Sequence, residues 1–81
     1  MTISEVLALK SRLEAEKGVT VRNVYVSPRD QASLLTNDFV AFMPGPLTPL
    51  EPYQAGKFAT LHDLSWWLDQ ELPSGDIRFT E

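Results

Sequence analysis

The sequence contains no cysteine, which excludes disulfide bonds and any zinc site built on thiolates. Small secreted domains usually depend on disulfides because their cores are thin, so this absence favours a reducing compartment. No apolar run approaches the ~18 residues of a membrane-spanning helix, and the first residues lack the basic and apolar regions of a signal peptide. We therefore expect a cytoplasmic protein that binds no membrane.

Residues that carry catalytic or cofactor chemistry are also scarce. His62 is the only histidine, and no motif marks a serine as a nucleophile that it could activate. His62 and Asp69 lie seven residues apart without a third metal ligand beside them. The four glycines are isolated, so the sequence has no phosphate-binding loop. We predict no enzyme, no cofactor and no metal site.

The net charge is −4, and the acidic residues that cause it are concentrated near the C-terminus. Up to residue 57 the chain carries six acids and six bases, whereas the later residues include five acids and Arg78 as their single base. An acidic surface repels phosphate backbones, so we predict no direct binding of nucleic acid. The alternative explanation is that a mild acidic charge only keeps a small protein soluble.

The chain has 81 residues, so we expect one domain over 1–81. Its first predicted element is a helix that begins after Thr2 and ends before Gly18. Thr2 and Glu5 fit a capping box, and Gly18 supplies a left-handed stop. Apolar residues recur along this helix at three- and four-residue spacing. They are Ile3, Val6, Leu9 and Leu13, with Leu7 beside them.

The next part of the chain predicts a strand and an ambiguous segment. β-branched residues over 19–26 are typical of a strand. The segment 27–37 begins with serine and proline, which is typical of a helix start. The alternative is a hairpin that contains a strand over 32–36. We expect the short helix and keep the hairpin as the alternative.

An apolar run over 39–43 predicts a central strand with both faces covered. Two-layer domains of this size often cover only one sheet face. The second face could therefore pack against the proline-rich segment that follows or against another copy of the chain. The second possibility predicts a homodimer with a self-association surface formed by Phe39, Val40 and Phe42.

The rest of the chain predicts an irregular proline-rich loop over 44–56, an edge strand over 57–59, a last helix over 60–72 and a strand over 77–80. Leucines at three- and four-residue spacing form the buried stripe of this last helix. The predicted fold class is α+β. Two helices, or three if the short one forms, pack on a small, mostly antiparallel sheet of three to four strands.

Trp66 is the residue of the predicted last helix that most needs explaining. At about 100° per residue, Trp66 lies close to the side opposite the leucines. Either the proline-rich loop covers it, or it anchors a partner, since tryptophan is enriched at interface hot spots. The polar residues predicted beside it are His62, Asp63, Asp69 and Gln70.

We therefore expect a small, acidic, non-enzymatic protein-binding module that presents Trp66 to a partner with a basic rim and an apolar pocket. Such a module could inhibit its partner by occupying a functional surface, as anti-defence proteins of phages and mobile elements do. One alternative is a small enzyme or ligand-binding protein with a pocket under the proline-rich loop, formed by His62, Tyr53 and Arg22. The other is a self-assembling structural subunit paired through the strand predicted at 39–43.

Overall fold

The computed structural model describes residues 1–42 and 56–81. Within them the helices are α1 (Ile3–Lys17), α2 (Pro28–Asn37) and α3 (Phe39–Phe42), and the strands are β1 (Asn23–Val26), β2 (Lys57–Leu61), β3 (Leu64–Leu68) and β4 (Ile77–Thr80). The strand order is β2-β3-β1-β4; β1 and β3 are parallel, and the two outer pairs are antiparallel. The predicted α+β class, with helices on a small and mostly antiparallel sheet, is confirmed.

The local signals at both ends of α1 and at the start of α2 act as predicted. The Thr2 side chain accepts a hydrogen bond from the backbone N–H of Glu5, and Gly18 ends α1 with a φ of 66°. Ser27 caps α2 in the same way by accepting from the N–H of Asp30 at 3.1 Å. The short helix predicted after residue 27 is therefore confirmed, and the hairpin alternative for this segment is wrong.

The strand predicted over 39–43 is wrong for its described part. Phe39–Phe42 forms the one-turn helix α3, which begins directly after Asp38 at the end of α2. The N–H of Phe42 donates to the carbonyl of Asp38, so the chain coils again instead of extending. This turn directs the Phe42 ring against Phe58 and Trp66, with centroid distances of 5.8 and 5.3 Å. Packing of one aromatic side chain outweighs the strand preference of the run.

The helix predicted over 60–72 is also wrong, because β2 and β3 form a hairpin there. Leu61 and Leu64 pair on either side of a two-residue turn made by His62 and Asp63. Both turn residues have positive φ values, 53° and 60°, as the tightest hairpin turns require. The chain beyond the hairpin, up to β4, is a turn-containing loop.

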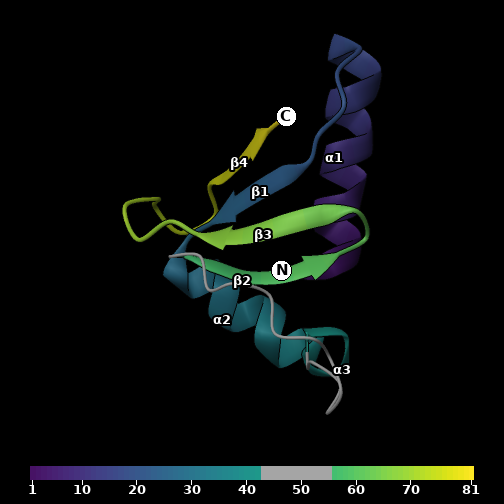
Figure 1. Ribbon diagram of the computed structural model, residues 1–81. Coiled ribbons are helices and arrows are strands. Elements are labelled where there is room, and N and C mark those ends of the chain that lie inside the picture. The colour runs from purple at the N-terminus through teal and green to yellow at the C-terminus, as the bar shows by residue number, and fades with distance from the viewer. Residues whose placement is uncertain (43–55) are drawn as a thin grey trace.

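The molecule has two layers, with the helices gathered on one face of the sheet (Figure 1). Side chains alternate along each strand, so β1 directs Val24 and Val26 toward the helices, and β3 does the same with Leu64 and Trp66. The buried core also includes residues from α1, α2 and the segment before β1. These residues are Ile3, Val6, Val21 and Leu34.

Three further predictions differ in extent or cannot be followed. The strand predicted over 19–26 begins later, at Asn23, whereas the short edge strand predicted at 57–59 extends to Leu61. The strand predicted over 77–80 is confirmed as β4. The proline-rich loop predicted at 44–56 lies outside the described residues, except for Gly56. Among the helices of the described residues, none has the length and hydropathy to cross a membrane.

Candidate functional site

The residues predicted to surround Trp66 are not brought together. The Trp66 side chain is 0% exposed and lies in the core, where its Nε1 donates to the Leu61 carbonyl at 3.2 Å. His62 and Asp63 precede β3, whereas Asp69 and Gln70 follow it, so the five-residue strand separates the two pairs. The prediction that Trp66 stands on an outer helix face is therefore wrong. Trp66 is a core residue of a strand.

The predicted self-association residues are divided as well. Phe42 packs inward on Trp66, while Phe39 and Val40 are 58% and 85% exposed. A strand pairing through 39–42 is excluded because these residues are helical. Of the residues proposed for a pocket under the proline-rich loop, Tyr53 lies outside the described part of the chain. His62 and Arg22 are exposed.

The face of the sheet turned away from the helices carries an ordered row of side chains. In the strand register, Lys57, Trp67, Tyr25 and Arg78 stand side by side across all four strands. Trp67 and Tyr25 are stacked with a centroid distance of 5.9 Å, and the Arg78 guanidinium lies 4.8 Å from the Tyr25 centroid. Trp67 also donates from Nε1 to the Asn23 side chain. Trp67 is half-buried in this outer row.

The side chains of this outer row already interact with one another and with Asp69. Trp67 and Arg78 contact the Tyr25 ring from the two neighbouring strands. Asp69 pairs with the Arg78 guanidinium at 3.4 Å. Bases bound by sheet platforms stack on open aromatic faces. We therefore interpret the row as a cross-strand stabiliser of the sheet.

A more open surface lies beside β4 on the helix-covered face of the sheet, where α1 is longer than the sheet is wide. The 15 residues of α1 extend for about 22 Å at 1.5 Å per residue. Four strands spaced about 4.8 Å apart span only about 14 Å between the first and last strand axes. In Figure 1, α1 runs across the strands, and its C-terminal end reaches past β4.

The apolar stripe of α1 is unevenly buried. Ile3 and Val6, near its start, are 6% and 0% exposed. Leu13 is half-buried against the core, and Leu9 is 41% exposed although it belongs to the same stripe. Leu9 is therefore the least covered member of the stripe. The sequence shows the stripe, but how deeply each of its residues is buried depends on the assembled sheet.

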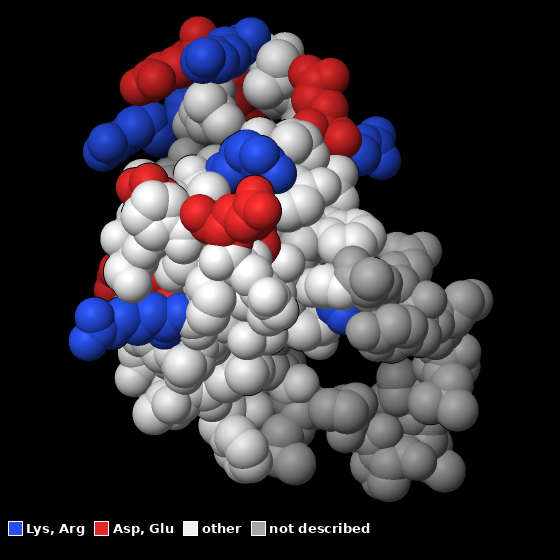
Figure 2. Space-filling model, turned by 90° about the vertical axis from the view of Figure 1, so that its left-hand side faces the viewer, with Lys and Arg blue, Asp and Glu red and all other residues white. Residues whose placement is uncertain are grey.

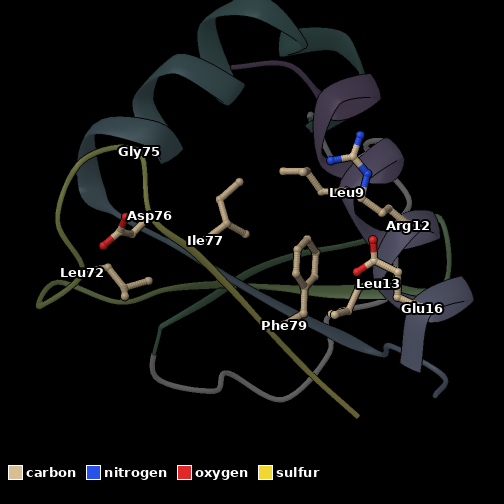
Figure 3. A pocket seen from close by; sticks show the side chains of 9 residues that line it. All are labelled: Leu9, Arg12, Leu13, Glu16, Leu72, Gly75, Asp76, Ile77 and Phe79. Atoms are coloured by element: carbon tan, nitrogen blue, oxygen red, sulfur yellow. The ribbon is translucent and has the colours of Figure 1, made fainter. Parts of the chain in front are cut away.

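Leu9 and Leu13 form one wall of an open groove of about 580 Å³. Figure 3 shows Leu9 and Leu13 on the α1 side and Ile77 and Phe79 rising from β4 toward the same space. Leu72 and Asp76, from the loop before β4, lie at the other end. The complete lining is Leu9, Arg12, Leu13, Glu16, Leu72, Gly75, Asp76, Ile77 and Phe79.

Buried polar contacts hold the loop that closes this end of the groove. Asp30, at the start of α2, accepts hydrogen bonds from the Ser27 hydroxyl and from the N–H of Gly75, both at 2.9 Å. Gly75 adopts a φ of 88°, which glycine reaches without a steric penalty. The loop is therefore fixed to the well-packed part of the molecule. The groove has one wall set by a helix and one end set by a buried carboxylate.

The wall formed by α1 is fixed near the C-terminal end of the helix. Glu14 accepts a hydrogen bond from the Val21 N–H at 2.9 Å and an ion pair from Lys10 at 3.1 Å. The Val21 N–H, followed by Lys10, holds the pKa of Glu14 below its usual value. These contacts join α1 to the segment that leads into β1. They keep this wall in place without covering Leu9.

The charges around the groove are mixed, with two acids and one base on its rim. Glu16 and Arg12 lie on α1, and Asp76 lies across the groove from them (Figure 3). Figure 2 shows the same mixing in another view, where basic and acidic groups intermingle in the upper part. Among the described residues on that side, no single sign of charge dominates, and they form no basic stripe of the kind expected of a nucleic-acid interface.

The described residues contain no group of three or more His, Cys, Asp or Glu side chains that could hold a metal ion. The chain matches no family model, no curated protein and no solved structure. The groove between α1 and β4 is therefore interpreted from its own geometry.

Proposed function

We propose that this chain is a non-enzymatic protein-binding module whose partner enters the groove between α1 and β4. The observation that supports this proposal most directly is Leu9. It belongs to the buried stripe of α1, yet it is 41% exposed beside an apolar groove. An apolar floor with a few polar groups at its rim is the usual composition of a binding pocket.

The groove also fits a protein better than it fits a reacting substrate. Its charged groups are Arg12, Glu16 and Asp76, which stand at the rim and flank an aliphatic and aromatic floor. General acid–base chemistry requires a titratable group placed against the reacting atoms. His62, the single histidine, lies in the β2–β3 turn and does not line the groove. We propose that the module acts by occupying a surface of its partner, as an inhibitor does.

A pair of exposed leucines allows a matched test. Leu9 on α1 and Leu35 on α2 are 41% and 37% exposed, but only Leu9 lines the groove. We would use wild type, Leu9→Glu and Leu35→Glu as tagged baits in host lysate, with circular dichroism to verify that each is folded. We expect a partner that wild type and Leu35→Glu retain and that Leu9→Glu loses.

The opposite patterns contradict the proposal. Equal retention by Leu9→Glu would exclude the groove as the docking surface. Loss from both variants would show that the baits capture proteins through any exposed apolar side chain. A partner lost only from Leu35→Glu would place the site on α2 instead.

A further inference from the structure

We infer that the occupant of the groove is an extended segment of the partner protein that adds to β4 as a fifth strand. This inference rests on the proposed function and specifies how the partner binds. Its first basis is the sheet order, in which β4 is an outer strand that, among the described strands, pairs only with β1. An outer strand presents backbone N–H and C=O groups that can pair with another chain.

The second basis is the position of α1 relative to that edge. In a finished two-layer sheet, each strand has helix side chains packed against one of its faces. At β4 the helix continues beyond the edge of the sheet, because the C-terminal part of α1 reaches past the strand (Figure 1). A strand added beside β4 would find Leu9 and Leu13 already in place above it. The groove is the space between this overhang and the present edge.

The third basis is the alternation along β4. Ile77 and Phe79 point into the groove and are half-buried, whereas Arg78 and Thr80 are exposed on the other face. Residues of an added strand would alternate in the same way. Their inward side chains would fill the groove against Ile77 and Phe79. The segment therefore needs apolar residues at alternate positions.

The rim defines the charge of the segment. Asp76 directly precedes β4, so a basic side chain at the end of the segment beside it gains an opposite charge, whereas Glu16 and Arg12 on α1 carry opposite signs. The residues of the segment that face away from the groove need no particular charge, because Arg78 on that side of the sheet already interacts with Tyr25 and Asp69. The occupant is an apolar, alternating segment with a basic end.

Synthetic hexapeptides can test this mode on the whole chain. The first has valine at alternate positions, threonine between them and a terminal lysine. The second has the same composition with its valines contiguous, and the third carries N-methyl groups on alternate backbone amides. The measurements are NMR titration at millimolar peptide and hydrogen exchange of the backbone amides of β4.

We expect the alternating peptide to bind and to slow exchange of those β4 amides that do not bond to β1. The contiguous peptide should bind about tenfold more weakly, because its valines cannot all face the groove. The peptide methylated on the edge that faces β4 should lose a similar factor, because each lost pairing hydrogen bond contributes about 1 kcal/mol. Asp76→Asn should weaken the lysine peptide but leave its uncharged analogue unaffected.

Three results would overturn the strand addition. They are the absence of binding by the alternating peptide, equal binding by the methylated peptide, and binding that leaves every β4 amide unprotected. If these appear while Leu9→Glu still loses the captured partner, the groove is a docking site and only its mode is wrong. A dimer of the free chain with protected β4 amides would assign the edge to a second copy of the chain.

Discussion

The start of α1 and its later turns meet very different surroundings. The start is an enclosed end: the Ile3 N–H donates to the Asp38 side chain at 2.9 Å, and the N-terminal amine of Met1 donates to the Ser33 hydroxyl at 2.9 Å. Farther along, Leu9 and Leu13 line the groove, and Leu9 is exposed. One amphipathic helix thus closes the core at its start and has an open end beyond it. We propose that the enclosed end serves stability and the open end serves binding.

The largest effect is expected at the enclosed end, from Trp66→Ala. Trp66 is fully buried against Phe42, and its Nε1 bonds to the Leu61 carbonyl, so its removal leaves a large cavity and removes this hydrogen bond. We expect a loss of about 3–5 kcal/mol in the free energy of unfolding, measured by urea titration. Trp67→Ala, in the outer row, is the matched control and should lose less. A larger loss at Trp67 would reverse the assignment of the two rings.

An intermediate effect is expected from Asp30→Ala, which removes the link between the start of α2 and the loop that closes the groove. The Asp30 carboxylate accepts from Ser27 and from the Gly75 N–H, and both donors would be left without this partner. We expect a loss of about 1–3 kcal/mol, together with faster hydrogen exchange at Gly75. Unchanged exchange at Gly75 would mean that the loop is held by other contacts. The groove would then be independent of the enclosed end.

A smaller effect on stability is expected at the open end. Leu9→Ala removes a side chain that is already 41% exposed, so the free energy of unfolding should change by no more than about 0.5 kcal/mol. Ile3→Ala, on the same stripe, should cost about 2–5 kcal/mol because Ile3 is buried. Both values come from chemical denaturation. Similar costs at the two positions would show that α1 is packed evenly along its length.

The sequence predicted those elements whose signals are local. Thr2, Ser27 and Gly18 act within one helical turn, so their capping roles hold whatever the rest of the chain does. The last predicted helix failed because Leu64 and Leu68 are four residues apart, a spacing that fits one face of a helix and also one face of a strand. The hairpin turn also lacks the usual sequence signal. His62 and Asp63 occupy positions where asparagine and glycine are the usual signal.

The candidate site could not be predicted for a different reason. The stripe from Ile3 to Leu13 was recognised, but whether a stripe is buried depends on how many strands lie beneath it and on the direction in which the helix crosses them. That information belongs to the assembled sheet, in which β4 is paired with β1 from a distant part of the chain. The overhang of α1 and the groove beside Phe79 follow only from that pairing.

The smallest effect is expected from Glu14→Gln and concerns pH. Hydrogen bonding from the Val21 N–H and the ion pair with Lys10 lower the pKa of Glu14 in the folded chain. The folded state therefore holds this proton less tightly than the unfolded state, and the carboxylate stabilises the fold above the usual pKa of glutamate. That contribution disappears as the pH falls through the lowered pKa. Glutamine can still accept from Val21 but does not titrate.

Thermal melts of wild type and Glu14→Gln between about pH 7 and about pH 3 measure this difference. We expect wild type to be the more stable of the two at neutral pH and the gap to narrow toward acid. Lys10→Met removes the ion pair alone and should reduce the gap only in part, because the Val21 N–H is the larger cause of the lowered pKa. A gap that stays constant with pH would show that Glu14 does not hold the open end of α1 through its charge. Position 14 would then contribute through packing alone.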